Sequence, residues 1–263
     1  MKKLLCMLLM LALTVGMTAA AGAENDSKLG DFANRLKKAA QQQIAQEPEA
    51  AQEAEADVSH GPALRINDPF YQKVRSSAYL QESKYSKEAN VMIEVKNVSG
   101  RTLYPDNAKI TAYNAAGEVL DEETYSSYGP DMVENGDSLF IWDWFYGFDA
   151  PVAEIAYFEV MIESDTDSYT DYAKIDGQAL VSNGIAFALV ENTLDTDIYG
   201  VQSVIAIENA EGTLLDVCEI STGNAIGLFP GSTMVQRANA KDYAADTGLL
   251  EGSATAYVLY ELD

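Results

Sequence analysis

The sequence repeats itself with a period of 95 residues, and this repeat limits the possible folds more than any other feature. An ungapped comparison of residues 95–121 with residues 190–216 finds nine identical residues among 27 positions. Chance matching at ordinary composition gives roughly two identities. The same offset pairs Gly136 with Gly231. The repeat therefore predicts two copies of one folded unit in tandem.

The repeat continues toward the C-terminus once an insertion is allowed. Five additional residues in the second copy align Ala156-Tyr157 with Ala256-Tyr257. Each copy then has a length of about 95–100 residues, which is an ordinary size for one small domain. We expect the first copy to occupy residues 63–166 and the second copy residues 167–263.

Both copies have the patterns of antiparallel strands. Apolar and polar residues alternate with a period of two in residues 91–96 and again in residues 108–113. The second copy repeats the alternation with Ile185, Phe187 and Leu189. The sequences NAAG at 114–117 and NAEG at 209–212 place Asn first and Gly fourth, the preference of a type I turn that joins two strands.

Helical periodicity is absent after residue 63, whereas short strands recur every 8–15 residues. Six or seven such strands in about 100 residues are typical of an Ig-like sandwich. We predict an all-β protein with two tandem Ig-like antiparallel β-sandwiches, preceded by a short helix and a disordered acidic linker. The Cys-Trp-Cys framework of antibody domains is missing, so the likeness concerns architecture only.

Residues 91–121 resemble the FxLYD-type domains of bacterial exported proteins, whose signature strand runs into a Tyr-Asp-x-x-Gly-like turn. The first copy has ITAYN at residues 110–114, and the second has IAIEN at residues 205–209, without the tyrosine. The resemblance covers most of residues 67–263. It implies an extracytoplasmic β-sandwich. The motif that carries the resemblance contains no catalytic residue.

The N-terminus predicts export. Lys2 and Lys3 precede an apolar run from Leu4 to about residue 21, and the small residues Ala21-Gly22-Ala23 fit a cleavage site. We expect residues 1–23 to be a signal peptide that is removed, with a retained membrane anchor as the alternative. The mature protein is then secreted or extracytoplasmic, with no stable membrane insertion.

Residues 24–62 form a tail of different composition. Apolar residues recur at spacings of three and four, which predicts a short amphipathic helix; they are Leu29, Phe32, Leu36, Ala40 and Ile44. The following stretch carries five acidic residues through Asp57 and no basic residue, which is typical of a solvated, disordered spacer.

Composition excludes several functions. The net charge of −24 repels phosphate backbones, so we expect no nucleic-acid binding. The single histidine, His60, lies in the spacer, which argues against catalytic triads, and we expect no enzymatic activity. After signal cleavage Cys218 is the only cysteine; it is either a small buried side chain or a reactive thiol.

An acidic segment between the two copies is a candidate Ca²⁺ site. Asp165, Asp167 and Asp171 have the spacing of oxygen ligands for a hard cation. However, Thr170 and Tyr169 stand where an EF-hand needs glycine and a further ligand. We expect no other cofactor, and the alternative is a solvated acidic linker.

An aromatic strip in the first copy is the candidate contact for a ligand or partner. On a strand, one face would carry Phe140, Trp142, Trp144 and Tyr146. At the offset of 95, Trp142 and Trp144 become Arg237 and Asn239, so these positions are not expected in the core of a sandwich. The strip either stacks on an external partner or packs against the neighbouring repeat or the tail.

We therefore expect a secreted bacterial binding or interaction module without enzymatic activity. Its partner would be an unknown extracellular protein or glycan, bound through the aromatic strip. The alternative function is a structural spacer in an envelope assembly, with no ligand of its own.

Overall fold

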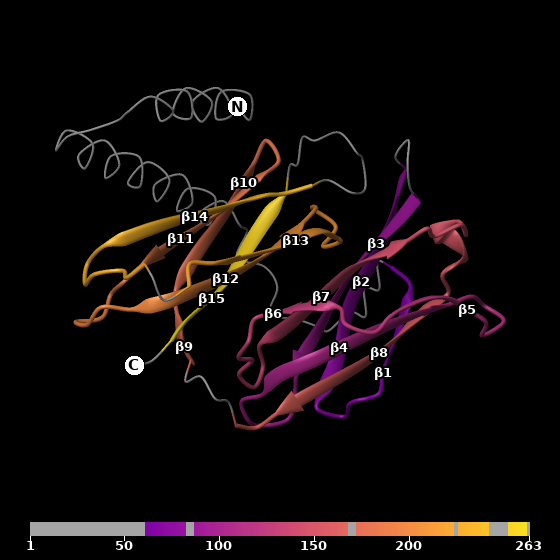
Figure 1. Cartoon of the computed structure of the whole chain (residues 1–263), viewed down its shortest axis with the longest axis horizontal. Coiled ribbons are helices and arrows are strands. Elements are labelled where there is room, and N and C mark those ends of the chain that lie inside the picture. Colours follow the sequence, from indigo (N-terminus) through magenta and orange to yellow (C-terminus); the bar gives the residue numbers. More distant parts are fainter. Residues whose placement is uncertain (1–60, 83–86, 168–171, 224–225, 242–251, 262–263) are drawn as a thin grey trace.

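The computed structural model describes residues 61–82, 87–167, 172–223, 226–241 and 252–261. The predicted signal peptide, the predicted helical segment, the acidic stretch up to residue 60 and Asp171 lie outside these residues. The described part is all-β, as predicted, and Figure 1 shows it as two bodies side by side. The expected boundary after residue 166 falls between strand β8, which ends at Asp165, and strand β9, which begins at Tyr172.

The first body is a two-sheet sandwich. Its strands are β1 (Ala63–Ile66), β2 (Tyr71–Glu82), β3 (Lys87–Asn97), β4 (Tyr104–Tyr113), β5 (Val119–Glu123), β6 (Ser127–Gly129), β7 (Ser138–Tyr146) and β8 (Tyr157–Asp165), with a short 3-10 turn, η1 (Val152–Glu154). One sheet, here called the β3 sheet, has the order β2-β3-β7-β6; the other, the β4 sheet, has the order β1-β8-β4-β5. The β3 sheet has the A-B-E-D order of an Ig sandwich.

The second body repeats this plan with fewer strands. Its strands are β9 (Tyr172–Ile175), β10 (Gly177–Ser182), β11 (Ile185–Glu191), β12 (Tyr199–Glu208), β13 (Leu214–Ser221), β14 (Thr233–Asn239) and β15 (Ser253–Glu261). The β11 sheet, β10-β11-β14, corresponds to the β3 sheet, and the β12 sheet, β13-β12-β15-β9, corresponds to the β4 sheet. All of its strand pairs are antiparallel, whereas β1 runs parallel to β8 in the first body.

The two sandwiches have cores of different size. Branched and aromatic side chains fill the first, including Ile93, Ile110, Ile141, Phe145 and Phe158. The second sandwich has two smaller clusters, one rich in alanine, including Ala186 and Ala188, and one of branched side chains, including Val190, Ile198 and Val258. Gln236 stands where the first copy has Ile141, and it is satisfied because Ser203 donates to its Oε1 and its Nε2 donates to the Val201 carbonyl. A buried amide is tolerated there because it has partners.

The two predicted turns are confirmed as type I turns with the same hydrogen bonds. Gly117 N–H donates to the Asn114 carbonyl at 3.0 Å, and Gly212 N–H donates to the Asn209 carbonyl at 3.1 Å. Both glycines have positive φ, 81° and 79°, which L-residues with a Cβ rarely adopt. In each turn the Asn Oδ1 accepts two backbone N–H groups that follow it.

A second repeated asparagine pins a loop in each sandwich. Asn97 Nδ2 donates to the carbonyls of Arg101 and Val133, both at 2.8 Å. Asn192 Nδ2 donates to the carbonyls of Thr196 and Leu228, at 2.8 and 2.7 Å. The identity of residues 97 and 192 in the sequence therefore has a structural cause, since each side chain satisfies buried backbone acceptors.

The offset of 95 holds through β3, β4 and β7, but the alignment of the last strand was wrong. Ile110 on β4 pairs with Val160, and its equivalent Ile205 on β12 pairs with Ala256. The last strands therefore correspond at an offset of 96, where the sequence comparison placed Ala156-Tyr157 against Ala256-Tyr257 at 100. A shift of four residues keeps every side chain on the same face, so alternation alone does not detect it.

Asp216 on β13 gives the fold a pH-dependent stability. Burial raises the pKa of this carboxyl to about 6, although N–H groups of Lys241 and Val217 donate to it at 2.8 and 2.9 Å. A carboxyl whose pKa is raised on folding favours the folded state most at low pH. That contribution is lost as the pH rises from about 4 through about 6.

We therefore expect Asp216→Asn to raise the free energy of unfolding at pH 7.5 by about 1–2 kcal/mol and to flatten its pH dependence between pH 4 and 7. The pKa shift limits this gain in stability to about 3 kcal/mol. The gain is smaller than this limit because the amide nitrogen of Asn replaces one of the two oxygens that accept hydrogen bonds. Urea titrations at several pH values measure this. Asp121→Asn is the matched control, since Asp121 is the repeat equivalent, also accepts the next N–H, and is less buried. Equal effects of both substitutions would contradict the assignment.

Candidate interaction site

The aromatic strip lies on β7 as predicted, on the face of the β3 sheet that points away from the sandwich core. Its exposure changes along the strand: Phe140 is 0% exposed, Trp142 9% and Tyr146 67%, with Trp144 half-buried. The core of the first sandwich contains the alternate residues Leu139, Ile141 and Phe145. The tryptophans are thus outside that core, yet half of the strip is buried.

The second sandwich covers the buried half of the strip. Met92, Phe140 and Trp142 form one hydrophobic cluster with side chains of the β12 sheet, namely Val204, Ala206, Leu214 and Val217. The ring centroids of Phe140 and Tyr257 are 5.2 Å apart, with the planes tilted by 56°. The β3 sheet of the first body therefore packs face to face on the β12 sheet of the second, between the β4 and β11 sheets. Phe140 and Trp142 contact the neighbouring repeat in this arrangement.

Close approach at this interface requires a glycine on the edge strand β6. A Cβ built at Gly129 would lie 2.7 Å from Cγ2 of Val204 and 3.7 Å from the Trp142 ring. Contacts below 3.0 Å essentially do not occur for real Cβ atoms, so any larger residue would push the sheets apart.

Comparison of the two copies shows why the outer face of the β12 sheet is covered by a sheet of the other copy and the outer face of the β4 sheet is not. The residues equivalent to Val204, Ala206 and Val217 in the first copy are Lys109, Thr111 and Glu122. Lys109 and Glu122 form an ion pair at 2.9 Å on the outer face of the β4 sheet. Outward positions that change from charged to apolar between copies indicate that the β12 sheet is covered, but they do not identify the surface that covers it.

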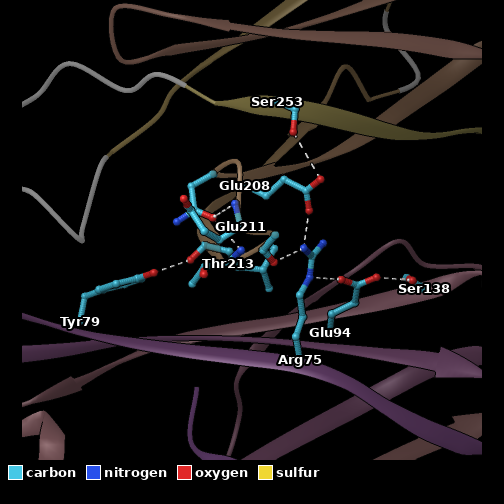
Figure 2. Close-up of polar contacts among 11 residues, drawn as sticks. Arg75, Tyr79, Glu94, Ser138, Glu208, Glu211, Thr213 and Ser253 are labelled. Atoms are coloured by element: carbon cyan, nitrogen blue, oxygen red, sulfur yellow. Dashed lines mark hydrogen bonds and ion pairs between the residues drawn. The ribbon is translucent and has the colours of Figure 1, made fainter. Parts of the chain in front are cut away.

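A polar cluster centred on Arg75 joins the two sandwiches at the edge of the apolar interface (Figure 2). Arg75 extends from β2 of the first body, and its Nε donates to Glu94 Oε2 at 2.5 Å. Its Nη1 donates to Glu208 and to the Gly212 carbonyl, both at the β12–β13 turn of the second body. Sequence analysis did not identify Arg75, Glu94 or Glu208, because single charged residues on strands carry no pairing signal.

The two carboxylates that bind Arg75 each accept a further hydrogen bond from a serine. Ser138 donates to the second oxygen of Glu94 at 2.6 Å, and Ser253 donates to Glu208 at 3.3 Å. Burial alone would lower the pKa of Arg75, but the carboxylates of Glu94 and Glu208 raise it above its ordinary value. Arg75 therefore stays charged, as a largely buried guanidinium held by two carboxylates requires.

Further hydrogen bonds surround the interface. Tyr79 Oη donates to the Leu214 carbonyl at 2.8 Å, and Lys174 Nζ lies 2.7 Å from Asp137 Oδ2. Tyr172 Oη also donates to Asp131 Oδ2, at 3.2 Å. An apolar centre with a hydrogen-bonded rim is the anatomy of a specific interface. The two sandwiches form one body through these contacts.

Trp144 is partly buried and packs against the interface cluster, whereas Tyr146 extends beyond the covered part of the strip. Tyr146 pairs with Glu88 and Trp144 with Asn90 across the ladder between β3 and β7, all on the outer face. An aromatic side chain that keeps a large exposed area next to a rigid sheet is suited to stacking on a sugar ring or to anchoring a protein. Tyr146, together with the exposed fraction of Trp144, is the accessible part of the predicted contact.

The acidic segment that suggested Ca²⁺ is only partly described. Asp165 ends β8 and Asp167 follows it, both exposed, while Asp171 lies outside the described residues. Among the residues that the structure describes, no group of three or more metal-ligating side chains occurs. The Ca²⁺ site stays a prediction.

Cys218 lies on β13 with its side chain buried in the second core, and it is a free cysteine. Burial and the neighbouring Asp216 carboxylate raise the pKa of its thiol well above the ordinary range. A thiol held neutral in this way is a poor nucleophile. His60 lies outside the described residues. Among the described residues, no helix is long and apolar enough to cross a membrane.

Comparisons with known proteins do not show a family. No family model matches the sequence, and no curated protein is similar to it. Among solved structures, the chain is similar to a transglutaminase of red sea bream at 10% identity and a TM-score of 0.19, covering 71% of this chain and 31% of that one. It is also similar to a secreted serine protease of Vibrio cholerae at 9% identity and a TM-score of 0.16, covering 72% of this chain and 45% of the protease. The chain thus spans less than half of either protein, and likenesses this weak carry no argument about function.

Proposed function

We propose that this protein is an exported, non-enzymatic interaction module in which two FxLYD-like sandwiches act as one rigid body. The observation that carries the proposal is the interface between the β3 and β12 sheets. It buries Phe140 and Trp142, packs partly against Trp144 and leaves Tyr146 exposed at its edge. The N-terminal signal sequence supports export, and the acidic charge favours partners other than nucleic acids.

The partner class that fits the remaining aromatic pair is an extracellular protein or a glycan. A tryptophan and a tyrosine two residues apart on one strand lie on the same face, so a sugar ring or an apolar side chain could contact both. The rigid attachment of the second sandwich keeps this face preformed, which lowers the entropic cost of binding.

The alternative is a structural spacer without a ligand. It is supported by the same interface, because burial of Phe140 and Trp142 between the sandwiches gives half of the strip a structural role. A rigid tandem body holds whatever is attached to its ends at a fixed distance.

Affinity capture from the exported and wall fractions of the host separates these functions. We expect Tyr146→Ala to lose at least about tenfold of the binding to a captured protein or wall polysaccharide, while its thermal unfolding changes little because Tyr146 is exposed. Phe229→Ala is the matched control, since Phe229 is an exposed aromatic residue on the second sandwich. A Tyr146→Ala variant that keeps every partner at the level of the control would reject the binding function and favour the spacer.

A further inference from the structure

The centre of the outer face of the β11 sheet is apolar and has little exposed area. Ala186 and Ala188 point into the second core, so the alternating residues Phe187 and Leu189 point outward. Across the sheet, Phe187 pairs with Leu180 and the exposed Arg237, and Leu189 pairs with Gln178 and Val235. Phe187 is only 6% exposed and Leu189 9%, yet neither belongs to a hydrophobic cluster formed by the described residues. A sheet face with such low exposure requires a covering segment.

The equivalent face in the first copy is covered by the β12 sheet, so a second copy of the chain is the first candidate. If a second copy of the chain continued the stack of sheets, the outer face of its β4 sheet would lie on Phe187. That face carries the Lys109–Glu122 ion pair and Arg65 stacked 3.5 Å from the centroid of the Tyr157 ring. Burying these charges against apolar side chains is unfavourable, and a charged outer face is typical of the end of a tandem array.

The amphipathic segment near the N-terminus, residues 29–44, has the apolar side chains needed to cover this face. Its apolar residues recur at helical spacing from Leu29 to Ile44, and residues 28–44 contain four basic residues but only one acidic residue, Asp31. The chain as a whole carries 41 acidic and 17 basic residues, so the remainder of the protein attracts a basic segment. A helix over 29–44 would be about 24 Å long, which matches a strand of about seven residues.

The connection is long enough. Gly61 is in close contact with Ser76 on β2, so the chain enters the described part at the β3 sheet. The β3 and β11 sheets are separated by the β12 sheet, hence by about 20 Å at about 10 Å for each sheet spacing. Residues 45–60 can span about 50 Å when extended. We propose that residues 29–44 dock as an amphipathic helix on the outer face of the β11 sheet, with Phe32 and Leu36 toward Phe187 and Leu189.

Hydrogen exchange on the mature full chain tests this docking. We expect amides of residues 31–44 to exchange at least about tenfold more slowly than amides of residues 47–57, since an isolated helix of this length is marginal in water. Leu36→Asp should remove this protection and increase binding of an apolar fluorescent dye. The matched control Asn34→Asp puts the same charge on the opposite helix face and should change neither readout.

The variants lie outside both sandwiches, so an unchanged thermal transition shows that the folded part is intact. Fast exchange over 31–44 in the unmodified chain would overturn the proposal, as would equal behaviour of Leu36→Asp and Asn34→Asp. A molar mass that doubles with concentration, with exchange over 31–44 unprotected, would assign the face to a second copy. Strong dye binding by the unmodified chain would show that the face is bare, and would also reject the docking.

Discussion

Trp142→Ala is expected to lower the free energy of unfolding by about 3–5 kcal/mol, the cost of removing a large aromatic side chain from a packed interior. Trp142 is nearly buried between the β3 and β12 sheets, where it packs with Val204 and with the edge strand at Gly129. Its loss leaves a cavity that two rigid sheets cannot close.

Tyr146→Ala is the matched control for this experiment. Tyr146 lies four residues along the same strand and the same face but is exposed, so its removal should change the free energy of unfolding by less than about 0.5 kcal/mol. Urea titrations followed by circular dichroism measure both variants. If the two truncations cost the same small amount, the two sandwiches do not pack on each other in solution.

The second large effect is expected at Arg75. Arg75→Ala leaves the buried carboxylate of Glu94 with Ser138 as a partner but without its cation, and it removes the link to Glu208 and to the Gly212 carbonyl. Removing one member of a buried ion pair costs about 3–5 kcal/mol, chiefly because the other charge stays buried.

A double replacement separates this penalty from a simple loss of packing. Arg75→Met combined with Glu94→Met should recover most of the lost stability, since replacing both charges by apolar groups is often neutral. Lys109→Ala, which breaks the partly exposed pair with Glu122 on the β4 sheet, should cost less than about 1 kcal/mol. A double variant as unstable as Arg75→Ala would show that the arginine acts through its contacts with the β12–β13 turn instead.

Much of each sandwich could be predicted from local rules. The alternation in residues 91–96 and the turns at Asn114 and Asn209 depend on neighbours within a few residues, so the sequence alone indicates them. The period of 95 then extended these local predictions to a second copy. The last strand was misaligned by four residues because its position depends on pairing with β4 and β12, which are distant in the sequence.

The candidate site was predictable only in part, and Trp142 illustrates the reason. Its replacement by Arg237 correctly placed residue 142 outside the sandwich core, and the alternation correctly placed it on a sheet face. The alternation along β7 is the same whether its outer face meets solvent, a ligand or another sheet, since alternation records which side a residue is on and not what covers it. Met92 and Glu94 on β3 show the same effect, because both lie on the outer side of the β3 sheet and are nonetheless buried.

The all-β class, the tandem repeat and the turns can be read from the amino-acid sequence, because they depend on residue type and short-range spacing. The packing of the β3 sheet of one copy on the β12 sheet of the other is visible only in the folded protein. This packing depends on long-range complementarity: Phe140 and Trp142 face Val204 and Ala206, and Arg75 reaches a turn more than 130 residues away. Such contacts are set by the shape and charge of two assembled surfaces, neither of which exists until each sandwich has folded.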